Sequence, residues 1–468
     1  MKKQTFGVIV GNRGFFPDIL ASDGRTNIVN VLKSAGYDVV ILNPNDTKYG
    51  AVETYADAKK CAELFVSKAD VIDGIIVTLP NFGDEKGVAE VIKRSSIAVP
   101  VLIQAEPDVA GKMDISCRRD SFCGKISVCS NLRQAAIPFT LTQNHTTAVD
   151  SKEFAADLDQ FAAVCRIVKG LKNVRFGAIG ARPAAFNTVR YSEKLLENSG
   201  ITVETIDLSE ILGRANRLKD SDVAVKNKLN AIKKYIETGG IPADAMLKIA
   251  KFGIVIDGYI KDNDLAGTAI QCWTSLQEFF GITPCTLMSM MSESLIPSAC
   301  EVDITGLVSM YILQLASGQP SALLDWNNNY GDDQDKCVLF HCSNLPKSFF
   351  DTATMDYHEI IAGTVGKENT YGTVVGRIRP NAATFCRITT DDTAGIINCY
   401  TGEGEFTKDK LDTFGGYGVF KIPNMQRLMK YICKMGYEHH VAMSMSQKAD
   451  AISEALDTYM GWEIHRHT

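Results

Sequence analysis

The stretch Val71-Ile-Asp-Gly-Ile-Ile-Val-Thr78, followed by helix-like residues 84–94 and then by Val99-Pro-Val-Leu-Ile-Gln104, decides the class of fold. Its two ends are almost continuous runs of β-branched and other apolar residues, as in strands that are buried on both faces. A helical segment between two such strands is typical of a crossover between parallel neighbours. The stretch therefore predicts a parallel sheet covered by helices on both faces.

The same alternation extends in both directions along the chain. It predicts a first doubly wound α/β domain at residues 1–165 and a second at residues 166–330, with residues 106–145 as a long, polar, functional loop. The expected strands are Phe6–Val10, Asp38–Leu42, Val174–Ile179 and Thr202–Asp207. The expected helices are Ile28–Ser34, 54–68, 151–170, Phe186–Glu197, 221–239, 243–260, 265–280 and 299–316.

Beyond about residue 330 the pattern changes to short strands. Tyr371–Arg379, Ala383–Thr389 and Ile396–Thr401 are rich in Thr, Val and Ile, and turn residues separate them. This pattern predicts a third, β-rich domain at residues 331–468, with an antiparallel, barrel-like sheet. Two helices, near 424–434 and 447–459, are expected to flank a strand that starts at His440.

Composition excludes several classes of protein. The chain has 468 residues, 45% of them hydrophobic, and a formal net charge of −6 without any cluster of Lys and Arg, which argues against a nucleic-acid binder. No apolar run reaches the roughly 18 residues that a membrane span needs, and the N-terminal apolar run is too short for a signal peptide. The 13 cysteines are odd in number, irregularly spaced and without a CxxC pair. We therefore expect a cytoplasmic protein with reduced thiols.

Three distant segments carry acids and imidazoles among apolar or small neighbours: Ala299-Cys-Glu301-Val-Asp303, Leu324-Asp325-Trp326 and His439-His440. A buried, ionised carboxylate is costly unless a cation or a donor compensates it. Glu301 is expected to open a helix and Asp325 to end a strand. Because consecutive strand residues point to opposite faces, only one of the two adjacent rings is expected to face a shared ion. The segments predict a divalent metal held between two parts of the fold.

Two further groups are candidates for binding a polar ligand. Arg118-Arg-Asp-Ser-Phe-Cys-Gly-Lys125 is a basic segment of the long loop, and Gly180-Ala-Arg182-Pro follows a strand, where backbone N–H groups can bind polar atoms. Each is expected to bind hydroxyls or an anion, with Arg13 as a further candidate. Glycine-containing turns follow the first strand of each doubly wound domain. A dinucleotide site at these turns is an alternative interpretation, although neither turn has the GxGxxG pattern.

These segments resemble the L-fucose/L-arabinose isomerase superfamily, most closely its fucose isomerase-like branch. The resemblance rests on Gly11-Asn-Arg13-Gly-Phe-Phe-Pro17, Asp120-Ser-Phe-Cys-Gly-Lys125, Gly180-Ala-Arg182-Pro, Gln271-Cys-Trp273, Ala299-Cys-Glu301-Val-Asp303, Leu339-Phe-His341-Cys and Glu438-His-His440. It implies two Rossmann-like domains followed by a β-rich C-terminal domain. It also implies a hexamer or a trimer-based assembly, in which a neighbour's first domain completes each active site.

The resemblance further implies a Mn²⁺-type ion held by Glu301, Asp325 and His440. Oxygen ligands with one imidazole suit Mn²⁺, and Mg²⁺ or Co²⁺ are its expected substitutes. In the arabinose-isomerase branch a second imidazole binds the metal, and His341 is at the matching position. The resemblance therefore implies that His341 either binds the metal or contacts the substrate.

The resulting hypothesis is a metal-dependent aldose–ketose isomerase that works through a cis-enediol. Its substrate would be a fucose- or arabinose-like free sugar or an anionic hexose such as sulfoquinovose. A nucleotide-dependent sugar dehydrogenase and a non-catalytic sugar-binding protein are the alternatives. Glu301 and Asp325 would transfer the protons. The predicted substrate contacts are Arg13, Arg118, Lys125, Arg182, Trp273, His341 and His439.

Overall fold

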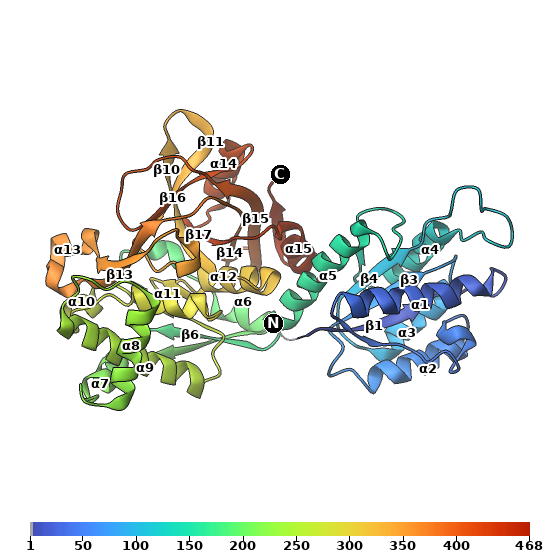
Figure 1. Ribbon diagram of the computed structural model, residues 1–468, viewed down its shortest axis with the longest axis horizontal. Coiled ribbons are helices and arrows are strands. Elements are labelled where there is room, and N and C mark those ends of the chain that lie inside the picture. Colours follow the sequence, from blue (N-terminus) through green and yellow to red (C-terminus); the bar gives the residue numbers. More distant parts are fainter. Residues whose placement is uncertain (1–2) are drawn as a thin grey trace. The chain divides into compact units, whose positions relative to one another are not determined.

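The computed structural model describes residues 3–468 and divides the chain into two compact units (Figure 1). The first unit comprises Met1–Lys169 and Glu454–Gly461, and the second comprises Gly170–Ser453 and Trp462–Thr468. No helix among the described residues is both long and apolar enough to cross a bilayer.

The first unit is built on a five-stranded parallel sheet with the strand order β2-β1-β3-β4-β5. The order differs from the 3-2-1-4-5-6 order of a dinucleotide-binding Rossmann sheet and matches the other common doubly wound arrangement. Its strands are β1 (Thr5–Val10), β2 (Asp38–Val40), β3 (Gly74–Leu79), β4 (Val101–Ala105) and β5 (Thr140–Leu141). Its helices are α1 (Asp18–Ser34), α2 (Tyr55–Val66), α3 (Glu85–Ser95), α4 (Ser121–Gln134) and most of α5 (Lys152–Leu171).

Alternate residues of each central strand enter different hydrophobic clusters, as buried strands with a two-residue period must. In β3, Ile75 and Val77 pack in one cluster with residues of α2, α3 and α4, while Ile76 packs in the other with residues of α1 and α5. The parallel sheet covered on both faces, expected from the sequence of this region, is confirmed.

The prediction of one long loop at residues 106–145 was wrong. It contains helix α4 and the short strand β5, and its longest part without helix or strand is residues 106–120. The sequence of α4 shows little helical periodicity, because its buried face is narrow and includes polar or small residues. This face includes Gly124, Lys125, Val128 and Leu132.

The second unit contains a four-stranded parallel sheet in the order β7-β6-β8-β9. Its strands are β6 (Val174–Ile179), β7 (Ile201–Ile206), β8 (Gly267–Ile270) and β9 (Ser298–Cys300). The helices that accompany it are α6 (Glu193–Asn198), α7 (Leu208–Asn216), α8 (Val223–Tyr235), α9 (Ala243–Asp262), α10 (Ser275–Phe279), α11 (Cys285–Glu293) and α12 (Ile304–Ser317).

Three helix predictions in this region need correction. Residues 265–280, predicted as one helix, form strand β8 and the short helix α10. The helix predicted from Phe186 begins only at Glu193. The helix predicted at 299–316 begins at Ile304, since β9 precedes it. The errors at 265–280 and 299–316 come from short apolar segments, for which strand and helix periodicity cannot be distinguished.

The second unit also contains a nine-stranded sheet in the order β12-β13-β16-β11-β10-β17-β14-β15-β18. Most neighbours are antiparallel, but β13–β16 and β15–β18 pair in parallel, so the sheet is mixed rather than antiparallel. A short additional pairing joins β15 to β16. The strands are β10 (Ser321–Tyr330), β11 (Asp333–His341), β12 (Thr354–Tyr357), β13 (Tyr371–Arg377), β14 (Asn381–Asp391), β15 (Ile396–Phe406), β16 (Gly416–Lys421), β17 (His440–Ser444) and β18 (Glu463–Arg466). The remaining helices are α13 (Glu359–Val365), α14 (Met425–Met435) and α15 (Ala449–Glu454).

Helix α12 connects the two sheets of the second unit. It contacts β8 and β9 of the four-stranded sheet and β10, β14 and β17 of the nine-stranded sheet. A helix that is apolar on all sides is stable only when it is buried on all sides, and most residues of α12 are buried. Its N-terminus lies beside the start of β17, because Asp303, the residue that precedes the helix, is hydrogen-bonded to His440.

Helix α4 provides a test of packing in the first unit. A Cβ atom at Gly124 would lie 1.6 Å from the backbone oxygen of Phe82. We therefore expect Gly124→Ala to lower the free energy of unfolding by about 1–3 kcal/mol or more through overpacking, measured by thermal denaturation. In the control, Gly258→Ala in α9, the new Cβ meets nothing within 4 Å. The control should be neutral or stabilising by about 0.5–1 kcal/mol. Equal melting of the Gly124→Ala variant and the unmodified protein would contradict this packing.

Candidate active site

A cavity of about 470 Å³ in the second unit gathers the acids and imidazoles that the sequence singled out. Its walls come from the segments that follow β8 and β9, from β10 and β11, from α13 and from the start of β17. The lining residues are Phe186, Trp273, Thr274, Glu301, Asp325, Asn327, Phe340, His341, Cys342, His358, Ile360, Ile361, Thr364, His439 and His440.

Glu301 reaches the cavity from a left-handed turn between β9 and α12. Glu301 and Val302 have φ values of 55° and 56°, a conformation that is uncommon for residues other than glycine. Asp303 then caps α12, because its Oδ1 accepts the backbone N–H of Gly306 at 2.8 Å. Glu301 thus precedes the helix, which corrects the prediction that it opens one.

Asp325 and His440 are direct cross-strand partners in the antiparallel pair β10–β17. Directly opposed residues of an antiparallel pair project from the same face of the sheet. Asp325 therefore lies inside β10, not at its end as predicted, and its position is set by pairing with β17.

The two carboxylates converge on one imidazole nitrogen. His440 Nε2 lies 3.5 Å from Asp325 Oδ1 and 3.7 Å from Glu301 Oε2. Trp273 Nε1 donates a hydrogen bond of 2.9 Å to the other oxygen, Oε1, of Glu301. The three residues predicted as metal ligands thus lie together, and Trp273 fixes the orientation of one of them.

A buried ionic network binds the ring nitrogen of His440 that does not face the cavity. Its Nδ1–H donates to Asp303 Oδ2 at 2.8 Å, and Arg387 donates to both oxygens of Asp303, at 2.6 and 3.1 Å. Arg387 also donates to Glu438 at 3.0 Å. All four residues are buried. Since Nδ1 is engaged by Asp303, only Nε2 faces the cavity, which is how carboxylates commonly orient imidazole ligands.

The network also sets the charges of the site. Burial would raise the pKa of Asp303, but the charge of Arg387 and the hydrogen bond from His440 outweigh it and hold the pKa well below its usual range. Burial would likewise lower the pKa of His440, but its bond to Asp303 and the nearby carboxylates raise it to about 9. His440 therefore carries a proton when no other cation compensates the acids.

Burial dominates at the two cavity-facing acids. It raises the pKa of Asp325 to about 7 and also raises the pKa of Glu301, in both cases against the opposing effect of His440. These carboxyl groups are consequently easier to protonate than exposed ones. Such perturbed groups in a cavity are typical of functional sites.

Three buried polar atoms of the site lack a hydrogen-bond partner: Glu301 Oε2, Asp325 Oδ1 and His341 Nδ1. Atoms of this kind usually have a partner in native proteins, and an unplaced ion is one explanation for the exceptions. Ligand atoms of Glu301, His341 and His440 lie within 4.8 Å of one another, as do those of Asp325, His439 and His440. The residues present therefore fit a divalent cation with oxygen and imidazole ligands.

Both His341 and His439 belong to the cavity wall. The ring of His341, at the end of β11, lies 5.9 Å from that of His440 between centroids. His439 Nε2 lies 3.8 Å from Asp325 Oδ1, and its ring meets Phe186 edge-on at 5.2 Å. Both rings of the His439-His440 pair approach Asp325, whereas the expected alternation would have directed them to opposite faces. Strand β17 begins at His440, so the two-residue alternation does not apply to His439.

The predicted basic residues are outside this lining. Arg182 donates to the backbone oxygen of Pro183 at 3.2 Å, near Phe186 in sequence. Arg13, Arg118 and Lys125 belong to the first unit. In that unit Arg13 pairs with Glu85, Arg118 pairs with Asp120 at 2.8 Å, and the buried Lys125 donates to Thr142 at 2.7 Å.

Sequence reasoning gave no role to several residues that shape the site. Asp303, Arg387 and Glu438 form the network behind His440, while Phe186, Asn327 and His358 line the cavity. The burial of Arg387 could have been predicted, because it is the single cation in the largely apolar strand segment Ala383–Ile388. A buried cation requires a buried counter-charge. Nothing local indicated which acid would supply it.

Fold and cavity together define an α/β protein with a carboxylate–imidazole site, and comparison with known sequences identifies the family. Residues 7–172 match the N-terminal domain of fucose/sulfoquinovose isomerases, and residues 339–467 match the C-terminal domain of L-fucose isomerases. These ranges together take in more than half of the chain. The chain belongs to the fucose isomerase-like family, which confirms the resemblance noted from its motifs.

The curated relatives found are sulfoquinovose isomerases. That of Priestia aryabhattai is 24% identical over 59% of this chain and 60% of the relative, and that of Alkalicoccus urumqiensis is 26% identical over 58% and 59%. A third, from Clostridium sp. strain MSTE9, is 29% identical over 37% and 38%. The chain thus spans about 60% of the length of the first of these relatives.

Solved structures add little to this assignment. An acetyl-coenzyme A synthetase from Ca. Korarchaeum cryptofilum aligns with 68% of this chain and 65% of its own, at 10% identity and a TM-score of 0.22. A TM-score this low supports no structural equivalence.

The network behind His440 gives a testable consequence for stability. Removing the guanidinium in Arg387→Met leaves Asp303 and Glu438 buried without their counter-charge. We expect a loss of about 3–5 kcal/mol in the free energy of unfolding, measured by chemical denaturation. As a control, Arg175→Met removes a partly exposed ion pair with Glu204 and should cost at most about 1 kcal/mol. Similar small losses in both variants would mean that the network does not stabilise the unit.

Proposed function

We propose that the protein is a metal-dependent aldose–ketose isomerase that acts on a free sugar. The observation that carries this proposal is the convergence of two unpartnered, buried carboxylate oxygens on His440 Nε2 in a cavity. Membership of the fucose isomerase-like family and the names of the relatives support it.

In this proposal Glu301, Asp325 and His440 hold the cation, and Mn²⁺ suits these ligands, with Mg²⁺ or Co²⁺ as substitutes. His341 is a candidate fourth ligand, because its Nδ1 is buried without a partner. When bound, the ion would polarise the sugar carbonyl and stabilise the negative charge that develops on its oxygen.

The proposed chemistry of the chain's own residues is proton transfer between neighbouring sugar carbons. One carboxylate, Glu301 or Asp325, removes the proton from C2 of the aldose while the other gives a proton to O1, which yields the cis-enediol. The first then returns its proton to C1 and the second takes the proton from O2, which completes the ketose. Without a bound cation, burial raises the pKa of Asp325 to about 7. A cation held by this carboxylate would lower the pKa again and favour the ionised form that accepts a proton.

The walls of the cavity offer the other contacts that a sugar requires. The rings of Phe186 and Trp273 meet at 5.7 Å between centroids and present apolar surface. Asn327 and His439 supply polar groups beside them. An apolar wall with a few convergent polar groups is the usual composition of a small-molecule site.

The relatives' substrate favours an anionic hexose such as sulfoquinovose over a neutral sugar for this protein as well. A sulfonate needs a cationic partner, and within residues 3–468 the cavity lining contains no Lys or Arg. We propose that a neighbouring copy of the chain supplies the cation from its first unit. Arg118 is the best candidate of the three predicted there, since 53% of its side chain is exposed.

An oligomer also accounts for exposed apolar side chains in the first unit. Phe15, Ile19 and Ile115 are 80%, 56% and 92% exposed, in or beside the segments that follow β1 and β4. Successive parallel strands carry such segments at the same edge of the sheet. Clustered apolar side chains on a surface are typical of protein interfaces. We propose a homo-oligomer, a hexamer or a trimer-based assembly, with active sites at its subunit interfaces.

Metal removal tests the proposal directly. EDTA-treated protein should form no ketose, and Mn²⁺ added back should restore turnover, with sulfoquinovose converted faster than fucose or arabinose. Saturating Mn²⁺ should also raise the melting temperature, since a ligand at 100 times its Kd adds about 2.7 kcal/mol of stability. NAD-dependent oxidation without a metal requirement would instead identify a dehydrogenase. Metal-dependent sugar binding without turnover would identify a non-catalytic binding protein.

Substitution of Glu301 tests its role in proton transfer in a protein that should still fold. Glu301→Gln keeps the size of the side chain and its bond from Trp273 but removes the charge. We expect turnover to fall by at least about 10²-fold, in line with the loss of a general base, while thermal denaturation shows a folded protein. Glu405→Gln, an exposed acid of β15, serves as the matched control and should keep normal activity. Near-normal turnover by the Glu301→Gln variant would refute the assignment.

A further inference from the structure

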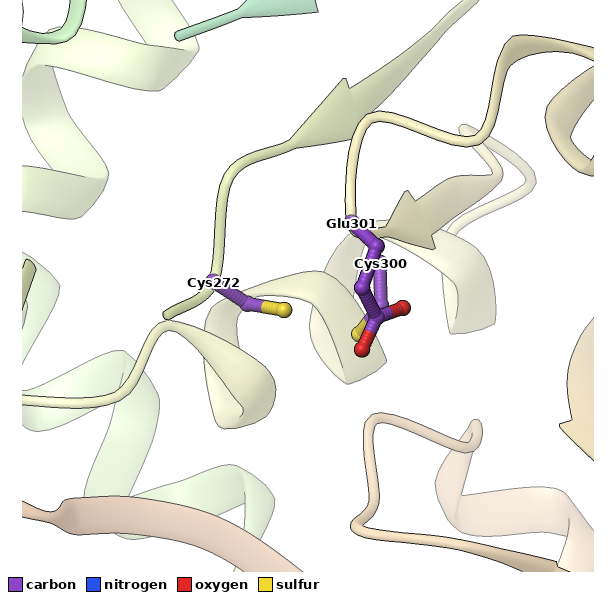
Figure 2. Close-up of side chains that lie close together, drawn as sticks. All are labelled: Cys272, Cys300 and Glu301. Carbon is purple, nitrogen blue, oxygen red and sulfur yellow. The ribbon is translucent and has the colours of Figure 1, made fainter. Parts of the chain in front are cut away.

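A group of three buried cysteines lies directly beside Glu301, and the proposed isomerisation makes no use of it. Cys272 follows β8, Cys285 begins α11 and Cys300 ends β9, and each is at most 5% exposed. We call these residues the thiol cluster. Figure 2 shows the Cys272 side chain directed toward Cys300 and Glu301. Two separate segments thus bring the sulfur atoms of Cys272 and Cys300 close to one carboxylate.

The side chains of this cluster lie near one another. Cys272 and Cys285 both affect the pKa of Cys300, and Cys272 affects the pKa of Glu301. One sulfur of Cys272, one of Cys300 and one carboxylate oxygen of Glu301 lie within 4.8 Å of one another. All three cysteines are free.

These separations are close to those of ligands around one soft cation. Zn²⁺ binds thiolate sulfur at about 2.3 Å and carboxylate oxygen at about 2.0–2.2 Å, so two sulfurs on one ion are at most about 4.6 Å apart. Small side-chain shifts would suffice to bring the two thiols and the carboxylate to such an ion. The Glu301 carboxylate is more than nine-tenths buried and its Oε2 has no partner, so this side chain supplies an anionic group that is not fully satisfied.

The chemistry of the donors selects a different ion from that of the cavity. Sulfur ligands favour Zn²⁺, Cd²⁺ and similar soft cations, whereas Mg²⁺ and Mn²⁺ favour oxygen ligands. Glu301 lines the cavity, but Cys272 and Cys300 do not. Glu301 therefore lines the cavity and also lies within reach of two thiols that do not line it.

We propose that Cys272, Cys300 and Glu301 form a second cation site, which binds a thiophilic divalent ion such as Zn²⁺. Each thiol that binds the ion releases its proton to solvent. Cys285, which lies near Cys300, is placed to act as a further ligand. An ion bound there competes with the cavity for Glu301. The competition rests on the proposed function of Glu301, whereas the binding itself does not.

Co²⁺ is a suitable spectroscopic probe, because thiolate ligands give it intense near-ultraviolet charge-transfer bands that oxygen and imidazole ligands do not. The EDTA-treated full-length protein is titrated with Co²⁺ under reducing conditions. We expect a saturable thiolate band that Zn²⁺ or Cd²⁺ displaces and that the double variant Cys272→Ser, Cys300→Ser lacks. Cys433→Ala, which removes an exposed cysteine, should keep the band. Absence of a saturable band in the unmodified protein, or its persistence in a folded double variant, would overturn the proposal.

A second measurement on unmodified protein covers the case in which the double variant does not fold. The release of bound Mn²⁺ is followed by electron paramagnetic resonance while Cd²⁺ is added. We expect Cd²⁺ to weaken Mn²⁺ binding at least tenfold when it fills the thiol cluster, with the thiolate band rising in parallel. Release of Mn²⁺ without any thiolate band would contradict the thiol site. A thiolate band in protein that never bound Mn²⁺ would instead count against the proposed function and leave the thiol site intact.

Discussion

The contact of Asp303 with His440 and Arg387 is the constraint on which the site depends. Asp303 caps α12 through one oxygen and accepts from His440 and Arg387 through the other, so one carboxylate links a helix start to strands β14 and β17. The group is buried, where an unpaired charge would be very costly. Because His440 Nδ1 is thereby engaged, Nε2 must face Glu301 and Asp325. The charges of the cavity follow from this arrangement.

The position of α12 explains how distant segments reach one cavity. This apolar helix must be buried on all sides, and it obtains that burial between the four-stranded and the nine-stranded sheets. The end of β9, with Glu301, is thereby brought to the strand pair that carries Asp325 and His440. The same side chain also lies close to the thiols of Cys272 and Cys300. One carboxylate thus lies near two donor sets that favour different cations.

Much of the fold and part of the site could be predicted from the sequence. The parallel sheet of the first unit has strong periodic signals, and the acids and imidazoles stood out because apolar neighbours surround them. The strand β8 and the left-handed turn at Glu301 were missed, since short apolar segments look alike as helix or strand. The partner of Arg387 could not be predicted, because no local pattern specifies a contact 84 residues away. A domain boundary near residue 330 stays a prediction.

By itself, the sequence determined the α/β class, the alternation of strands and helices, and the identity of the acids and imidazoles available for chemistry. These properties follow from local periodicity and side-chain type. Only the tertiary structure decided which groups meet: Asp325 opposite His440, Asp303 behind it, and the thiols beside Glu301. Such choices depend on strand register and on the packing of α12. Both are settled by burying the whole core at once, so no single segment of the chain encodes them.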